Sequence, residues 1–198
     1  MGKICVCITM VFTIALCACK NDTSAEEQHE QEVVYNDNIQ DTFFGVSFGA
    51  SKEDVITAFA SHNFYPGYFD TDSRLSFEKK IGYKTLERFS FGDMTWKMLD
   101  VYLSNNKFHQ IAFMNSHKTR ESALNEFENV LSQVSAKYHL QESSPDDTTI
   151  YKMYVGVSRD EQWICVRCFS YESIGGEHLI GTQLAYGNNQ FEYISDEL

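Results

Sequence analysis

Apolar and polar residues alternate along several stretches of this chain, and two other stretches place apolar residues at helical spacing. Alternation is typical of a half-buried strand, whereas apolar residues three and four apart line one face of a helix. The pattern predicts strands at residues 43–49, 97–104, 107–115, 149–157, 162–171 and 178–186. It also predicts a short helix that begins after Ser51 and a longer helix at residues 119–138. Because the strands follow one another through short connections, we expect an α+β fold: an antiparallel sheet with two helices packed on one face.

Polar residues mark where both helices begin. Ser51 and Asp54 form a capping-box pattern, and Thr119 is the expected N-cap of the longer helix.

The residues from Gly45 to Gly49 match G-x-S-x-G, the pattern of a hydrolase nucleophile elbow. In such an elbow the serine lies on the turn that enters the helix, but here Ser51 caps the helix and Ser47 stays on the strand. We therefore expect no nucleophile elbow at this position.

Asn105 and Asn106 separate two predicted strands and tolerate the positive φ of a two-residue hairpin turn. Counting outward from this turn predicts a buried face on which the facing pairs are Leu103 with Phe108, Val101 with Gln110, and Leu99 with Ala112. The opposite face would carry Met98, Asp100, Tyr102, His109, Ile111 and Phe113. Aromatic side chains with a polar tip are enriched at protein interfaces, so Tyr102 and His109 are candidates for partner binding. The alternatives are that another element covers this face or that a bulge changes the register.

A second aromatic group surrounds the turn at residues 64–69, Phe-Tyr-Pro-Gly-Tyr-Phe. Tyr65 and Tyr68 are further candidates for partner binding. The alternative is that part of this group closes the core.

The beginning of the chain has the features of an export signal. Lys3 precedes an apolar run at residues 4–18 that contains two threonines and is too short to span a bilayer. Leu16-Cys17-Ala18-Cys19 resembles the lipobox of bacterial lipoproteins. The resemblance implies a signal peptide at residues 1–18 and a lipidated Cys19 that anchors the mature chain to the membrane. Residues 19–42 are polar and acidic, which predicts a disordered tether, and residues 43–198 would form a single domain.

Charge narrows the classes of partner. The formal net charge is -12, and an acidic surface repels nucleic acid and anionic lipid headgroups. We therefore expect no nucleic-acid partner and a membrane link through the lipid on Cys19. Lys20, directly after Cys19, resembles the sorting pattern of outer-membrane lipoproteins, and the acidic stretch resembles surface-export signals of some Bacteroides-type lipoproteins. The expected location is the bacterial envelope, at the outer membrane, facing the periplasm or the cell surface.

Cysteines and histidines form no recognisable metal or redox motif. Cys165 and Cys168 lie three apart on a predicted strand, where their side chains point to opposite faces, so a disulfide between them would need a bulge or a break. No helix start is present there to lower a thiol pKa. The six histidines lack metal-ligand spacing. We expect no metal site and no cofactor.

Residues 44–55, Phe-Gly-Val-Ser-Phe-Gly-Ala-Ser-Lys-Glu-Asp-Val, resemble the opening of small exported bacterial domains built as helix plus antiparallel sheet. These include the β-lactamase-inhibitor-protein-like fold and the small lipoprotein of the outer-membrane barrel-assembly machinery. The chain is also similar to small lipoproteins of Bacteroides-type bacteria. The resemblance covers about residues 43–140 and implies a non-catalytic binding module for another envelope protein or an exported ligand. Two alternatives stay open: a small envelope hydrolase, and an accessory scaffold for outer-membrane assembly.

Overall fold

The computed structural model describes residues 33–67 and 71–191. The expected signal peptide, Cys19, the first part of the tether and Tyr68 lie outside the described residues. Within the described ranges, no helix is both long and apolar enough to cross a membrane.

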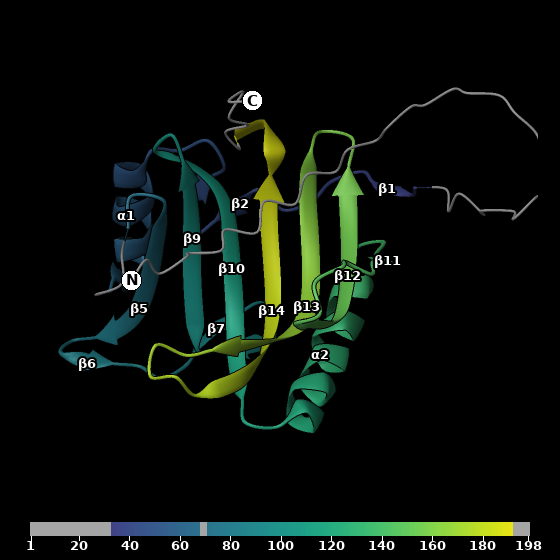
Figure 1. Cartoon of the computed structure of the whole chain (residues 1–198). Helices are drawn as coiled ribbons and strands as arrows, with labels where there is room; N and C mark the ends of the chain where they lie inside the picture. Colours follow the sequence, from purple (N-terminus) through teal and green to yellow (C-terminus); the bar gives the residue numbers. More distant parts are fainter. Residues whose placement is uncertain (1–32, 68–70, 192–198) are drawn as a thin grey trace, which may run out of the picture. The chain divides into compact units, whose positions relative to one another are not determined.

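A helix followed by antiparallel strands occurs twice along the chain, and the strands of both halves form one large sheet (Figure 1). This arrangement is α+β, as the sequence predicts. The first half contains α1 (Lys52–Ser61), β4 (Phe64–Pro66), β5 (Arg74–Ile81), β9 (Met98–Ser104) and β10 (Lys107–His117). The second half contains α2 (Arg120–Ser135), β11 (Gln141–Glu142), β12 (Ile150–Ser158), β13 (Gln162–Glu172) and β14 (His178–Asn188). The predicted strands of the second half are thus confirmed to within two residues.

Within each half, the strands pair in the order in which they follow one another along the chain. The path across the sheet is β1-β12-β13-β14-β10-β9-β5-β4, with β11 beside β12 and β6 (Lys84–Thr85) beside β5. The last strands of the two halves, β10 and β14, pair antiparallel in the middle of this path. The sheet is therefore two similar meanders joined along their final strands.

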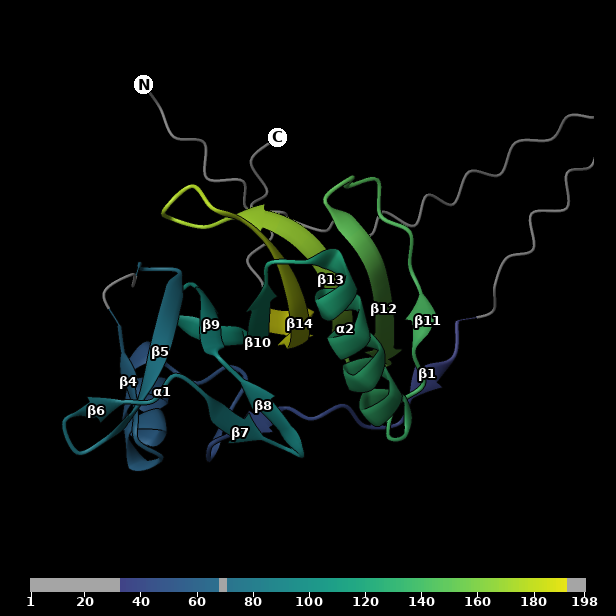
Figure 2. The same ribbon diagram turned by 90° about the horizontal axis from the view of Figure 1, so that it is seen from below.

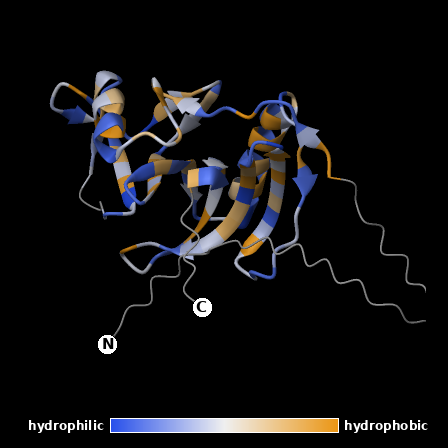
Figure 3. Ribbon diagram, turned by 90° about the horizontal axis from the view of Figure 1, so that it is seen from above, coloured by the Kyte–Doolittle hydropathy of each residue, from blue (hydrophilic) through white to orange (hydrophobic). Residues whose placement is uncertain are grey.

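Both helices lie on the same side of the sheet, which we call the helix side (Figure 2). The small hairpin of β7 (Phe89–Phe91) and β8 (Met94–Trp96) lies there too. A second small hairpin, β2 (Thr42–Phe43) with β3 (Val46–Ser47), contributes Phe43 and Val46 to the same core. Apolar and polar residues alternate along the central strands (Figure 3), and the apolar set faces the helices. The core is rich in phenylalanine; the rings of Phe91 and Phe113 stack with centroids 4.0 Å apart. One apolar core thus joins the helices, the small hairpins and the sheet.

The predicted helix starts are confirmed. The Ser51 side chain accepts a hydrogen bond from the Asp54 amide at 3.2 Å, and the Asp54 carboxylate lies near the Ser51 amide, which completes the capping box. Thr119 caps α2 by accepting from the Ser122 amide at 3.3 Å. α2 ends at Ser135, short of the predicted residue 138, and the amides of Lys137 and Tyr138 both donate to the Val134 carbonyl in a turn that closes the helix.

The predicted strand at residues 43–49 is instead a tight hairpin. β2 and β3 pair across a two-residue turn formed by Phe44 at φ 51° and Gly45 at φ 85°. A phenylalanine in this left-handed region is strained. Its ring packs on Phe59 and Phe64 at 4.9 Å between centroids, and these contacts offset the strain.

The predicted pairing of the central hairpin is correct only next to its turn. Asn105 and Asn106 both have positive φ, and Leu103 faces Phe108 as expected. A bulge between Phe108 and Gln110 then inserts His109, so Val101 faces Ile111 and Leu99 faces Phe113. Ile111 and Phe113 are consequently fully buried on the helix side, and Gln110 and Ala112 lie on the opposite face, contrary to the prediction.

The fold also begins earlier than the sequence predicts. β1 (Tyr35–Asn36) pairs in parallel with β12, and Ile39 is buried in the core. Asn36 accepts from the His139 amide at 2.7 Å and donates to the His139 carbonyl at 3.0 Å. Part of the segment assigned to the tether from composition, from Tyr35 to Ile39, therefore belongs to the folded structure.

Candidate functional site

The sheet has a second face, opposite the helices, which we call the helix-free face because no helix in the described part of the chain packs on it. Residues directly opposite each other on neighbouring strands point to the same face. The register places side chains from five strands there: Trp163, Arg167, Phe169 and Tyr171 of β13, Gln183 of β14, Gln110 and Met114 of β10, Tyr102 of β9, and Arg74 of β5. The loop between β13 and β14 also lies on this side (Figures 1 and 2).

Two aromatic rings on this face lie over glycines of the neighbouring strand. Trp163 faces Gly187, and a Cβ at Gly187 would stand 2.3 Å from the indole ring. Phe169 faces Gly181, where a Cβ would stand 3.0 Å from the phenyl ring. The Trp163 indole N–H also donates to Asn189 Oδ1 at 2.9 Å. These rings therefore lie close to the sheet, and glycine is the residue that makes room for them.

Hydrogen bonds fix the polar side chains of β13. Arg167 Nε donates to Gln183 Oε1 at 2.7 Å, and Arg167 Cζ lies 4.6 Å from the centroid of the Phe169 ring. The Tyr171 hydroxyl pairs with Ser116 Oγ at 2.5 Å and so links β13 to β10. The stripe of β13 is thus a surface of three aromatic rings and one guanidinium whose polar groups are held by hydrogen bonds.

A second polar group on the same face surrounds Asp100, which is 5% exposed. Its carboxylate accepts from Arg74 Nη2 at 2.7 Å and from Ser76 Oγ at 2.6 Å. Arg74 Cζ also lies 5.9 Å from the centroid of the predicted candidate Tyr102, which faces Arg74 in the register. Tyr102 is therefore a half-buried part of an ordered polar cluster.

His109 occupies the extra position of the β10 bulge, next to the residue that faces Tyr102. It is half-buried, and burial lowers the pKa of its imidazole from the ordinary value of 6.5. His109 itself faces no residue of β9 in this register, and Gln110 takes the position opposite Tyr102. The register therefore differs from the one expected, and joint partner binding by Tyr102 and His109 stays a prediction.

Of the other predicted candidates, the structure describes only Tyr65. Tyr65 is 39% exposed on the edge strand β4, where it faces Glu78, four residues along β5 from Arg74. Tyr68 and Cys19 lie outside the described residues.

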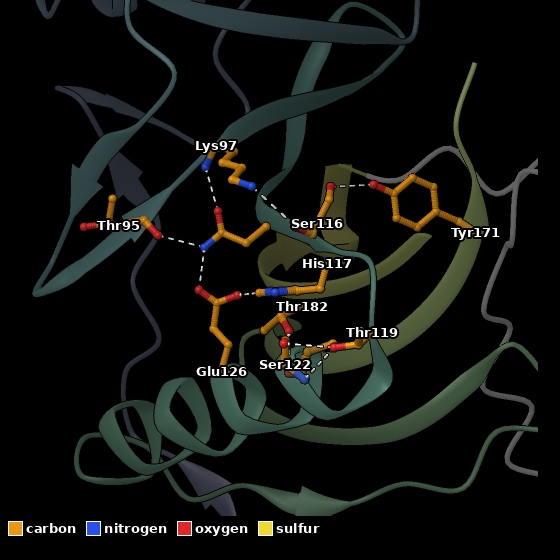
Figure 4. Close-up of polar contacts among 11 residues, drawn as sticks. Thr95, Lys97, Ser116, His117, Thr119, Ser122, Glu126, Tyr171 and Thr182 are labelled. Atoms are coloured by element: carbon orange, nitrogen blue, oxygen red, sulfur yellow. Dashed lines mark hydrogen bonds and ion pairs between the residues drawn. The ribbon is translucent and has the colours of Figure 1, made fainter. Parts of the chain in front are cut away.

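A separate polar cluster lies on the helix side, between β10 and α2 (Figure 4). The buried Asn115 donates to Thr95 O and Glu126 Oε1, both at 2.8 Å, and accepts from the Lys97 amide at 2.8 Å. The other Glu126 oxygen pairs with His117 Nε2. Both carboxylate oxygens are thus engaged, and the cluster connects the β7–β8 hairpin to α2.

This cluster contains a histidine and a carboxylate, but no nucleophile in the described part of the chain is bonded to His117. Ser116 Oγ is engaged with Tyr171 on the opposite face. Cys165 and Cys168 are unpaired and buried, and burial raises the pKa of each thiol to about 11. Ser47 lies on β3 beside Thr42, at 2.7 Å between hydroxyls, away from the start of α1. In the described residues, no three His, Cys, Asp or Glu side chains gather as a metal-ligand set.

Sequence reasoning missed the stripe of β13. Trp163, Arg167, Phe169 and Tyr171 share one face of a strand that was predicted correctly, together with the small buried Cys165. The available signal was the pair Gly181 and Gly187, which lie an even number of residues apart on the following strand and so share one face. Glycines inside a strand often mark a site of close approach.

No protein-family model, curated protein or solved structure matches the chain.

Proposed function

We propose that this chain is a lipid-anchored envelope lipoprotein whose folded part is a non-catalytic binding module. Its helix-free face would recognise another envelope protein or an exported ligand. The anchor would be a lipid on Cys19, and the acidic residues after it would hold the module away from the membrane surface. The lipobox at residues 16–19 supports the anchor, and the resemblance of residues 44–55 to exported bacterial domains supports the binding role.

The aromatic stripe of β13 is the observation that carries this proposal. Tryptophan, tyrosine and arginine are the residues most enriched among the energetic centres of protein interfaces. Here they share one face, and their hydrogen bonds and glycine contacts hold them in place. A surface fixed before binding loses little side-chain entropy when a partner docks.

Site-specific photo-crosslinking in intact cells tests the binding role. A photoreactive phenylalanine derivative replaces Gln110 on the helix-free face or, as the control, Asn125 on the exposed side of α2. We expect one dominant protein adduct from position 110 and none from position 125. Equal adducts from both positions would contradict the proposal, and a barrel-assembly component in the adduct would favour the accessory-scaffold alternative.

The anchor is tested independently by metabolic labelling with a fatty-acid analogue. We expect label on the native chain and its loss in Cys19→Ser. Label that persists in this variant would place the lipid elsewhere, and an unlabelled native chain would remove the envelope anchor from the proposal.

A further inference from the structure

The guanidinium of Arg167 is held from two sides. Gln183, which is 5% exposed, accepts from Nε at 2.7 Å, and the Phe169 ring lies 4.6 Å from Cζ. Phe169 is itself packed on Gly181. A guanidinium has five N–H donors, and the bond to Gln183 uses the one on Nε. Among the residues that the structure describes, no acceptor engages the four donors on the two terminal nitrogens.

No carboxylate in the described part of the chain forms an ion pair with Arg167. Arg74 on the same face, by contrast, forms an ion pair with Asp100 at 2.7 Å. Asp147 lies close enough to sense the charge of Arg167, but its Oδ1 accepts from the Thr149 amide at 2.9 Å and the Thr149 hydroxyl at 2.7 Å. A half-buried guanidinium without an acidic partner has given up hydration that no ion pair replaces.

We propose that Arg167 binds a carboxylate of a protein partner, supplied by an Asp or Glu side chain flanked by apolar residues. This inference rests on the proposed function and specifies the partner's chemistry. The two terminal nitrogens of a guanidinium match the two oxygens of a carboxylate, which makes arginine the residue suited to bidentate recognition.

The surroundings of Arg167 favour a single carboxylate over a polyanion. Met153 faces Arg167 on one side, and Met114 lies beyond Gln183 on the other, so the cross-strand row around the guanidinium is largely apolar. The net charge of -12 repels highly charged partners such as nucleic acid or an anionic membrane. One acidic side chain between apolar neighbours would pair with the Arg167 guanidinium while its apolar neighbours contact the methionines of the row.

The test uses a library of random 12-residue peptides displayed on phage and selected against the full-length chain purified in detergent. We expect the selected peptides to contain Asp or Glu next to apolar residues, and replacement of that residue by Asn or Gln to weaken binding by about tenfold or more. Arg167→Gln should produce the same loss. Arg167→Lys keeps the charge but lacks the planar fork, so we expect an intermediate loss.

Arg88→Gln is the matched control, since Arg88 is an exposed arginine in the loop before β7 and its loss changes the net charge equally. Peptides without acidic residues, or acidic peptides that bind Arg167→Gln and the native chain equally, would overturn the inference. Such a result would leave the proposed function standing if position 110 still gave its adduct. If a selection against the full-length chain yields no acidic peptides but the same selection against a chain lacking residues 20–32 does, the chain's own acidic segment is the occupant, and the inference of an external partner would be wrong.

Discussion

At the scale of single residues, His109 links the β10 bulge to a dependence of stability on pH. Burial lowers the pKa of this imidazole below 6.5 in the folded state, whereas it titrates near its ordinary value in the unfolded chain. As pH falls below about 6.5, the unfolded state binds a proton that the folded state does not, so the free energy of unfolding decreases until the lower folded pKa is passed. Urea unfolding between about pH 5 and 8 should show this decrease in the native chain and a shallower one in His109→Gln.

His178→Gln serves as the control for this measurement, because His178 is exposed at the start of β14. If both variants flatten the pH curve to the same extent, burial in the bulge is not the cause.

Trp96 is fully buried, yet its indole N–H has no hydrogen-bond partner among the residues that the structure describes. A buried donor without an acceptor carries a desolvation penalty of about 1–3 kcal/mol. Trp96→Phe removes the donor while keeping a ring against Phe113, so we expect a loss in unfolding free energy of only about 1 kcal/mol. Trp96→Ala should cost about 3–5 kcal/mol, as for other large core truncations. Chemical denaturation measures both, and equal losses would show that the indole N–H is satisfied in solution.

At the scale of elements, the pairing of β13 with β14 depends on glycine under Trp163. A Cβ at Gly187 would stand 2.3 Å from the indole, so Gly187→Ala must displace the ring, and we expect a loss of about 1–3 kcal/mol in stability. Trp163→Leu should remove most of this penalty, and a double-mutant cycle by urea unfolding measures the coupling between the two positions. Gly175→Ala is the control, since its Cβ would meet only Ser173 Oγ at 3.8 Å. Additive losses would mean that the ring does not lie on Gly187 in solution.

The elements that follow local rules were predictable, and those set by tertiary packing were not. Ser51 and Thr119 cap helices through contacts three residues away, and Asn105 with Asn106 forms a turn from its own dihedral preference. The bulge at His109 has no local signal, because it is the burial of Ile111 against the helices that decides the register beyond it. The stripe of β13 was missed for a similar reason, because Trp163 and Phe169 are placed by Gly187 and Gly181, which lie opposite them on β14.

At the scale of the whole fold, the two halves share one sheet through β10 and β14 and one core through the side chains beneath these strands. Phe43 of the first half lies 5.1 Å from Tyr186 of β14 between ring centroids, and Phe91 lies 6.4 Å from the same ring. Neither half can separate without exposing this shared surface to water. The repetition of helix and meander therefore does not imply two independently stable halves.

The positions of the two tryptophans make it possible to measure whether the two halves unfold together. The chain has two tryptophans, Trp96 in the first half and Trp163 in the second. Trp96→Phe keeps only the tryptophan of the second half, and Trp163→Phe keeps only that of the first half. If folding is two-state, the urea midpoint measured by fluorescence equals the midpoint measured by circular dichroism in each variant. We expect this coincidence in both variants, with midpoints that differ between variants only through the cost of the substitution. If fluorescence and circular dichroism separate in either variant, the halves unfold independently, and the β10–β14 pairing contributes less to stability than the shared core indicates.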